Sequence, residues 1–423
     1  MKIFCSGIGG IGLSAYAALR VQQGHTVHGS DRSESQITRD LEVLGVVVSL
    51  LQDGTALSAD TDLFVYSEAI PKDAPERKRA EELGIPQQSY FQALGELSKN
   101  GRVIAVCGTH GKSSTTSMTA KVLLDAGQDP TVVVGTRVPD LDGRNWHHGR
   151  EDLFLLEACE YRRSFHFLSP DIVIMTNVDG DHFDAYGDLA EYQDAFVEFL
   201  RRLPEHGVVI THGSDPDCRR LAEASGRRMI DADAFELPTL TIPGKHMRQN
   251  AQLTLALAAH LGIADSPARG SLQAYRGCWR RLERKGVWNG VTVFDDYGHH
   301  PKEVRATLAA IREVAGAARL VCVFQPHTHA RTFSFYQEFV ESFADADVVI
   351  VPNVYDARSD IERDHVDVER FVADLRAQGI DAYNGESLAH TEQMLRSAVL
   401  RPGDYLLCLG AGDVTKLASA MVD

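Results

Sequence analysis

The feature that most constrains the fold is the alternation of short apolar runs with amphipathic helical patterns along the whole chain. Runs such as Val103 to Val106 are only a few residues long, and each is followed by a polar turn and a helix-like pattern. Short runs without a polar face are typical of strands buried on both sides, as in a parallel sheet covered by helices. The pattern therefore predicts an α/β fold rather than a β-sandwich or a helix bundle.

Two polar breaks, at residues 98–101 and 284–286, divide this pattern into three parts. Since 423 residues are too many for one ordinary core, we expect three consecutive α/β domains. These are a Rossmann-like domain at 1–98, a P-loop-type central domain at 99–286 and a second Rossmann-like domain at 287–423. The expected strands are 3–6, 26–29, 63–66, 103–106, 153–156, 172–176, 291–294, 320–324 and 348–352. The expected helices are 13–23, 114–125, 248–260, 301–314 and 335–343, followed by a strand-turn-helix at 405–421.

Charge and cysteine usage limit the partners and the compartment. Lys and Arg number 43 against 59 for Asp and Glu, and the net charge of -16 disfavours nucleic acid or an anionic membrane as the main partner. The seven cysteines include no Cys-x-x-Cys pair, which indicates a reducing environment. Because the sequence shows no secretory leader and no apolar run long enough to span a bilayer, we expect a cytoplasmic protein.

A first glycine-rich turn, Gly7-Ile8-Gly9-Gly10-Ile11-Gly12, lies between an expected strand and an expected helix. Its G-x-G-x-x-G pattern permits a tight turn and a close approach of the backbone to a pyrophosphate at the helix N-terminus. Asp31 follows the next strand, where an acidic side chain reaches a ribose. The turn fits NAD or another pyrophosphate ligand such as a UDP-sugar, and its alternative role is strand–helix packing alone.

A second turn, Gly108-Thr109-His110-Gly111-Lys112-Ser113, also joins an expected strand to an expected helix. Backbone N–H groups and Lys112 can hold the β- and γ-phosphates of a nucleotide, and the Ser113 hydroxyl can bind Mg²⁺. The turn is not a full Walker A motif, because Val106 stands where that motif has glycine. A nucleoside triphosphate site is the better interpretation, and a capped helix with a chance Gly-Lys-Ser is the alternative.

Two polar segments of the central part follow expected strands. One contains Glu157 and Glu160, and the other, residues 177–186, contains Asp181, His182 and Asp184. Side chains just past the carboxyl ends of parallel strands line the ligand crevice, so these groups are candidate Mg²⁺ ligands that face the phosphates. Taken singly, each is equally well interpreted as a solvated loop residue.

The last part carries histidines in two loops after strands, residues 295–301 and 325–332. A zinc site is disfavoured, because the adjacent His299 and His300 do not easily share one tetrahedral site and no cysteine completes a set. The guanidinium of Arg331 suits a carboxylate. We therefore interpret these loops as a substrate site.

Taken together, these segments resemble the Mur ligases of peptidoglycan synthesis, and the resemblance covers essentially the whole chain. It is strongest to the branch that adds L-alanine. One such match is ordinary chance, whereas all of them in this order and spacing are highly specific. The matching segments are Gly7 to Gly12, Gly108 to Thr116, Glu157 to Glu160, Thr176 to Tyr186, Asp295 to Pro301 and Phe324 to Thr332.

The resemblance implies an ATP- and Mg²⁺-dependent ligase that joins UDP-N-acetylmuramate to a small L-amino acid through an amide bond. The residues implied for the UDP substrate are Gly7, Gly9, Gly10, Ile11, Gly12, Asp31 and Ser67. Those implied for ATP are Gly108, Thr109, His110, Gly111, Lys112, Ser113, Ser114, His246, Asn250, Arg281 and Asp296. Those implied for the metal are Ser113, Glu157 and His182, and those for the amino acid are Tyr297, His299, His327 and Arg331.

A two-step reaction follows from the same resemblance. The muramate carboxylate attacks the γ-phosphate to give an acyl phosphate, while Mg²⁺ and Lys112 absorb the charge on the phosphoryl oxygens. The amine of the amino acid then displaces phosphate. An ammonium is not a nucleophile, so a base must first remove a proton, and His182 and His299 are both candidates for this catalytic role.

The chain departs from the family pattern at two positions. Met247 replaces the first asparagine of the Gly-x-His-Asn-x-x-Asn run, which predicts altered ATP recognition, and Thr328 replaces the usual arginine after Pro-His. The alternatives are a related ligase for another small amino acid or a recycled murein tripeptide, and a non-catalytic nucleotide-binding protein of the same ancestry. A more remote one is an NAD-dependent dehydrogenase, which leaves Lys112 without a role.

Overall fold

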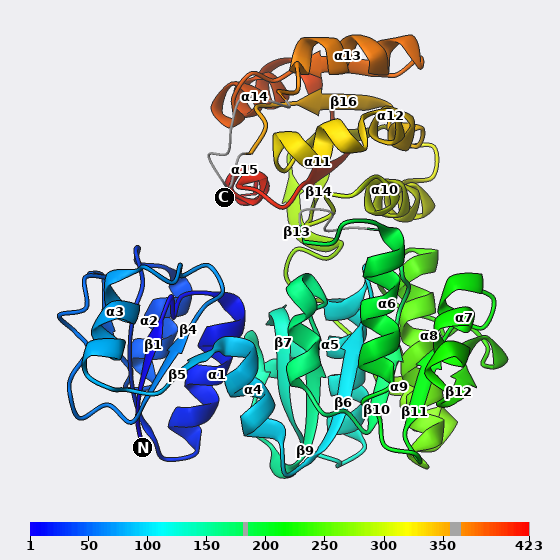
Figure 1. Ribbon diagram of the computed structural model, residues 1–423. Helices are drawn as coiled ribbons and strands as arrows, with labels where there is room; N and C mark the ends of the chain where they lie inside the picture. The colour runs from blue at the N-terminus through cyan, green and yellow to red at the C-terminus, as the bar shows by residue number, and fades with distance from the viewer. Residues whose placement is uncertain (181–184, 356–364, 423) are drawn as a thin grey trace. The chain divides into compact units, whose positions relative to one another are not determined.

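A computed structural model describes residues 1–180, 185–355 and 365–422, which form three helix-flanked sheets in succession along the chain (Figure 1). The expected architecture of three α/β parts is confirmed. By the density of its internal contacts, the chain forms two compact units, Met1–Thr239 with Asn250–Tyr275 and Leu240–Gln249 with Arg276–Asp423. The first two sheets belong to the first unit and the third sheet to the second. Among the described helices, none combines the length and apolar character needed to cross a membrane.

The first sheet has five parallel strands in the order β3-β2-β1-β4-β5. The order reverses beside β1, so the turn after β1 lies at the crevice where such sheets bind ligands. Ser35 and Ser89 begin α2 and α4 with capping boxes. The elements are β1 Lys2–Ser6, α1 Ile11–Gln22, β2 Thr26–Ser30, α2 Gln36–Val43, β3 Val47–Ser49, β4 Leu63–Tyr66, α3 Pro75–Glu82, β5 Gln87–Ser89 and α4 Tyr90–Ser98.

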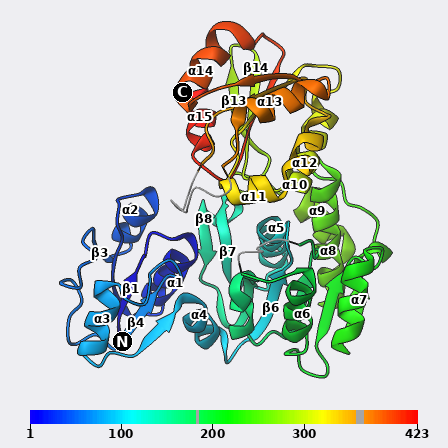
Figure 2. The same ribbon diagram turned by 45° about the horizontal axis from the view of Figure 1, so that its top comes forward.

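The second sheet has seven strands in the order β12-β11-β10-β6-β9-β7-β8, of which only the edge strand β8 is antiparallel. Helix α1 of the first sheet packs against β7 and β8 (Figure 2), and one hydrophobic core extends through both sheets. The strands are β6 Arg102–Cys107, β7 Pro130–Val138, β8 Arg144–His147, β9 Arg150–Glu157, β10 Ile172–Met175, β11 Val208–Thr211 and β12 Arg228–Asp231. The helices are α5 Lys112–Asp125, α6 Leu189–Leu200, α7 Pro216–Ser225, α8 Lys245–His260 and α9 Asp265–Gln273, with short turns η1 Pro139–Leu141, η2 Tyr161–Phe167 and η3 Ala232–Ala234.

The third sheet has six strands in the order β13-β14-β18-β15-β16-β17, and only the edge strand β13 is antiparallel. Its strands are β13 Glu283–Trp288, β14 Val291–Asp296, β15 Leu320–Phe324, β16 Val348–Val351, β17 Asp381–Asn384 and β18 Tyr405–Leu409. Its helices are α10 Pro301–Ala315, α11 His329–Ser334, α12 Tyr336–Val340, α13 Val368–Ala377, α14 Leu388–Met394 and α15 Val414–Ala420, with η4 Glu341–Phe343 and η5 Leu395–Val399.

Two local expectations differ from this structure. The polar segment 284–286 lies inside strand β13, whose ladder with β14 shifts register between Arg284 and Gly286. An edge strand needs little apolar surface, so its charged residues conceal it in the sequence. The expected helix 335–343 is observed as α12 followed by η4. Helix α11 precedes it and is separate from α12, because Phe335 has φ -112° and ψ 24°, outside regular helical geometry.

Candidate active site

The second glycine-rich turn joins β6 to α5 and is held against the segment that follows the neighbouring strand β10. Gly108 has φ +133°, and a Cβ there would lie 2.0 Å from Thr176 Oγ1. Thr109 N donates to Asn177 O at 3.0 Å, and His110 N donates to Asn177 Oδ1 at 2.9 Å. Glycine is therefore required at 108, and the turn is rigidly shaped by the strand beside it.

Lys112, the first residue of α5, folds its ammonium back into the turn. Its Nζ donates to Gly108 O at 2.6 Å, to Thr109 O at 3.0 Å and to Glu160 Oε1 at 3.0 Å. The Glu160 side chain is fully buried, and its other oxygen lies 2.9 Å from Nζ. Burial is the largest single influence and lowers the pKa of Lys112, but Glu160, Cys159 and Glu157 together outweigh it, so the pKa is raised overall. A charged ammonium thus lies in the turn that the sequence predicted to bind phosphates.

Ser113 and Glu157 form an oxygen pair beside this ammonium. Strand register places Glu157 opposite Val106, and its Oε1 accepts a hydrogen bond from Ser113 Oγ at 3.0 Å. Its Oε2 accepts from Gly135 N at 2.7 Å. Hydroxyl and carboxylate oxygens are hard donors of the kind Mg²⁺ prefers, so these side chains fit the expected metal. The third expected ligand, His182, and its neighbours Asp181 and Asp184 lie outside the described residues.

The other residues assigned to ATP in the first unit lie around the same turn. A Cβ on Gly111, which has φ +80°, would lie 2.7 Å from Asn250 Oδ1 on α8. Thr109 Oγ1 is 2.8 Å from Tyr192 OH, and Ser114 is buried in the first turn of α5. Asn250 and the glycine turn, 139 positions apart in sequence, are thus brought into contact.

The first glycine-rich turn brings together the residues assigned to the UDP substrate. Gly7, with φ +78°, packs against Ser67, since a Cβ on Gly7 would lie 3.0 Å from Ser67 Cβ. Gly9 N donates to Asp31 Oδ2 at 2.8 Å. A Cβ on Gly12 would lie 2.7 Å from the Tyr90 ring, so this last glycine serves close helix packing. The turn and both predicted polar partners therefore form one surface.

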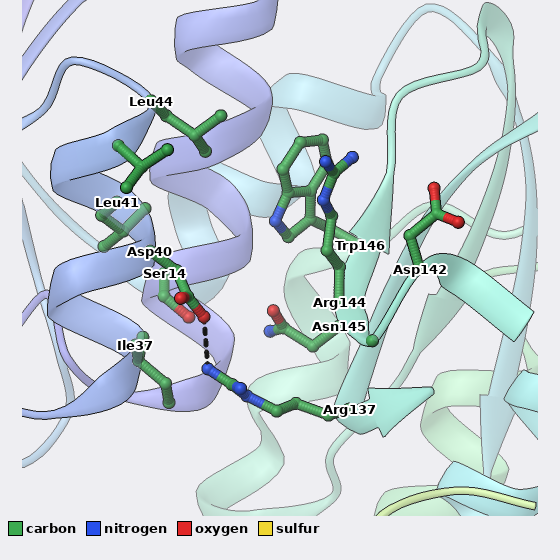
Figure 3. Close-up of a pocket in the computed structure, with 12 residues that line it drawn as sticks. Ser14, Ile37, Asp40, Leu41, Leu44, Arg137, Asp142, Arg144, Asn145 and Trp146 are labelled. Atoms are coloured by element: carbon green, nitrogen blue, oxygen red, sulfur yellow. Dashed lines mark hydrogen bonds and ion pairs between the residues drawn. The ribbon is translucent and has the colours of Figure 1, made fainter. Parts of the chain in front are cut away.

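A cleft of about 400 Å³ lies between helices α1 and α2 and the β7–β8 hairpin (Figure 3). Trp146 forms part of its wall, and Arg137 Nη2 pairs with Asp40 Oδ2 at 2.5 Å between the two sides. Asn145, next to Trp146, donates from Nδ2 to the carbonyl of Ile11. The hairpin of the second sheet is therefore tied to the first glycine-rich turn.

The four residues assigned to the amino acid lie together in the second unit. The rings of Tyr297 and His299 are 5.3 Å apart, and those of His299 and His327 are 5.6 Å apart. Arg331 Nη1 is 3.4 Å from His327 Nδ1. Thr328, which replaces the family's arginine, has φ +66° and accepts a hydrogen bond from Arg331 N. In the described part of the chain, no three His, Cys, Asp or Glu side chains surround a metal position.

Asp296 and Arg281, assigned to ATP, are engaged within the second unit. Asp296 is buried, its Oδ2 accepts from Leu282 N at 2.7 Å and its Oδ1 from Gly298 N at 2.8 Å. The Arg281 guanidinium lies 4.9 Å from the centre of the Tyr297 ring. Asp296 therefore shapes the loop that carries Tyr297, whatever else it binds.

Helix α8 carries the remaining ATP assignments and passes from one unit to the other. His246 belongs to the second unit, and burial lowers its pKa to about 4, so the imidazole is neutral at pH 7. Met247 is 2 % exposed and packs as a core residue. An apolar side chain thus fills the position where the family presents an asparagine amide.

Replacing Asp295 with asparagine is expected to change how stability depends on pH. Asp295 is fully buried, accepts a hydrogen bond from Thr415 Oγ1 at 2.6 Å, and burial raises its pKa to about 6. The protonated Asp295 therefore stabilises the folded state. This contribution to the free energy of unfolding is complete below the unfolded-state pKa of about 4 and is lost as the pH rises through about 6. Between pH 4 and pH 7, the free energy of unfolding of the variant should rise by about 2 kcal/mol relative to that of wild type. Urea unfolding at the two pH values measures this difference. An equal difference at both pH values would contradict this account, and the exposed Asp381→Asn on β17 is the control.

Sequence reasoning missed two contributions to the site. Gly135 interrupts a valine-rich strand, and a glycine inside a strand signals a close approach of another group. A Cβ there would lie 2.7 Å from Glu157 Oε1. Glu160 was a candidate metal ligand, whereas the structure shows it as the ion-pair partner of Lys112. No local sequence pattern predicts the pairing of Glu160 with Lys112, because the two residues are 48 positions apart.

Comparisons with known proteins cover nearly the whole chain. Family profiles match three successive segments: a Mur ligase family catalytic domain at residues 2–102, a Mur ligase middle domain at 106–236 and a Mur ligase glutamate ligase domain at 280–412. The UDP-N-acetylmuramate–L-alanine ligase of Clostridium kluyveri is 35% identical and covers 98% of this chain and 96% of that protein. The Streptomyces avermitilis ligase of the same name is 37% identical, covering 99% and 96%. The crystal structure of the Thermotoga maritima UDP-N-acetylmuramate-alanine ligase superposes with a TM-score of 0.83 at 28% identity, covering 100% and 98%.

Proposed function

The chain belongs to the Mur ligase family, and we propose that it joins L-alanine to the lactyl carboxylate of UDP-N-acetylmuramate, using ATP, in peptidoglycan precursor synthesis. The family resemblance stated from the motifs is confirmed by the full-length matches. The enzyme is an ATP-dependent ligase, and relatives that share over a third of its residues bear the alanine ligase name. The geometry that carries the proposal is the largely buried Lys112 ammonium beside the Ser113–Glu157 oxygen pair.

For the division of labour, we propose that residues 1–98 bind the UDP substrate, residues 99–286 bind ATP and residues 287–423 bind the amino acid. The first glycine-rich turn would place backbone N–H groups and Asp31 at the nucleotide, which fits a UDP pyrophosphate as well as NAD. The family membership favours UDP. Tyr297, His299, His327 and Arg331 would surround the amino acid, with the Arg331 guanidinium holding its carboxylate.

For the first chemical step, we propose that the muramate carboxylate attacks the γ-phosphate within the second turn. Lys112 would stabilise negative charge on the transferred phosphoryl oxygens, because its charged ammonium is already held at the turn before substrate arrives. Ser113 and Glu157 would hold Mg²⁺, which supplies charge neutralisation at the phosphates. His182 and His299 remain candidates for the base that frees the amine of alanine.

Release of inorganic phosphate from ATP tests this function. The assay contains the enzyme, Mg²⁺ and UDP-N-acetylmuramate, with L-alanine, L-serine, glycine or the recycled tripeptide as acceptor in separate reactions. We expect the highest kcat/KM with L-alanine. Omission of the UDP substrate is the control and should abolish release. Preference for the tripeptide would assign the enzyme to peptide recycling, and no release with any acceptor would refute the ligase assignment.

A further inference from the structure

We propose that Glu160 is a positioning residue that competes with the nucleotide phosphates for the ammonium of Lys112. The competition weakens nucleotide binding and so speeds the release of ADP. This inference rests on the proposed phosphate role of Lys112 and adds a residue that sets affinity at that site.

Every donor of the Lys112 ammonium is already engaged in the structure. An ammonium has three N–H groups, and Nζ contacts Gly108 O, Thr109 O and the Glu160 carboxylate at 2.6, 3.0 and 3.0 Å. A phosphate oxygen can therefore bind this ammonium only if one of these hydrogen bonds is released or shared. Nucleotide binding at the turn becomes an exchange of partners rather than the filling of an open position.

The carboxylate of Glu160 is the fixed member of this ion pair. Glu160 lies immediately before η2, its side chain is fully buried, and its backbone carbonyl accepts hydrogen bonds from Arg163 N and Tyr186 OH. Two residues of η2, Arg162 and Arg163, have φ +49° and +58°, a strained conformation that only the surrounding structure can hold. The Lys112 side chain has four rotatable bonds, so it is the partner that moves toward a phosphate.

Electrostatics then set the direction of the effect. Without nucleotide, Glu160 neutralises the Lys112 ammonium, which is only 15 % exposed. When a nucleotide is bound, the Glu160 carboxylate and the negatively charged phosphates lie on either side of the same ammonium and repel each other. Glu160 therefore stabilises the empty turn and destabilises the occupied one, which lowers affinity for ATP and for ADP.

Isothermal titration of the full chain with ADP and excess Mg²⁺ tests the proposal. Glu160→Gln keeps a hydrogen-bond acceptor for Lys112 and removes the charge, so its Kd for ADP should fall about tenfold. Glu160→Asp keeps the charge and should remain within about threefold of wild type. Glu198→Gln is the matched control, because Glu198 also forms an ion pair, with Arg163, but on the exposed face of α6.

A merely structural role for Glu160 predicts the opposite result, namely weaker ADP binding in Glu160→Gln. The nucleotide-free variant should melt below wild type and gain more from ADP, since phosphate then supplies the missing counter-charge. If the variant is isolated only with ADP bound, slower release of labelled ADP than from wild type supports the proposal. Equal or weaker binding, or equal or faster release, overturns it. Failure of ADP to bind wild type would instead refute the phosphate site itself.

Discussion

Replacing Lys112 with methionine is expected to lower turnover by roughly a thousandfold while leaving UDP-N-acetylmuramate binding detectable. The ammonium lies inside the second glycine-rich turn, bonded to two of its carbonyls, and methionine keeps much of the volume without the charge. Negative charge that develops on the transferred phosphoryl group would lose its positively charged partner. The UDP substrate is assigned to a different turn, so its binding should survive. Phosphate release gives turnover, and titration with UDP-N-acetylmuramate gives binding.

Lys121→Met is the matched control for this variant. Lys121 lies on the same helix α5 and pairs with Asp125 at 3.0 Å near the helix end, so its loss should leave turnover close to wild type. Removing Lys112 also leaves the buried Glu160 carboxylate without its counter-charge. Breaking a buried ion pair in this way lowers the free energy of unfolding by about 3–5 kcal/mol. The double variant Lys112→Met/Glu160→Gln removes both charges and should recover stability without recovering turnover. Recovery of turnover there would show that Lys112 has only a structural role.

Replacing Glu157 with glutamine is expected to lower turnover by roughly a hundredfold and to raise the Mg²⁺ concentration that the enzyme needs. The glutamine amide oxygen can still accept from Gly135 N, and its NH2 group can donate to the Ser113 hydroxyl, which can act as an acceptor, so the local structure should persist. The neutral amide, however, is a much weaker ligand for a hard cation than a carboxylate. Phosphate release measured across Mg²⁺ concentrations separates a metal-binding defect from a folding defect.

Glu151→Gln is the control for the Glu157 variant, because Glu151 lies on the same strand β9 with an exposed side chain. It should show wild-type turnover and wild-type Mg²⁺ dependence. If Glu157→Gln lowers turnover equally at all Mg²⁺ concentrations, Glu157 positions the turn through Ser113 and Gly135 rather than holding metal. Unchanged turnover would exclude both roles.

Much of the fold and of the candidate site could be predicted from local chemistry. Strand β15, residues 320–324, was predicted with its observed bounds, and β6 extends the expected run 103–106 by one residue at each end. A short apolar run bounded by polar residues carries its own signal. The two glycine-rich turns were recognisable for a similar reason, since only glycine suits the positive φ of Gly7, Gly108 and Gly111.

Other features depend on partners that are distant in sequence and could not be predicted. The pairing of Lys112 with Glu160 and the contact of Gly111 with Asn250 follow from strand order and helix packing. The edge strand β13 carries charged residues that resemble a loop. The family resemblance predicted more of the site than local physical patterns did, because it assigned residues that are distant in sequence to the same ligand.

The sequence by itself determined which side chains and which backbone freedoms are available: a lysine after a glycine turn, an acid at a strand end, and an arginine after two histidines. These features depend only on neighbouring residues, so their steric and chemical consequences can be predicted from one sequence. Only the tertiary structure decided which carboxylate serves which cation. Glu157 and Glu160 are three residues apart, yet one faces Ser113 and the other Lys112. Strand register puts Glu157 opposite Val106, and the turn into η2 buries Glu160, so packing rather than composition assigns their roles.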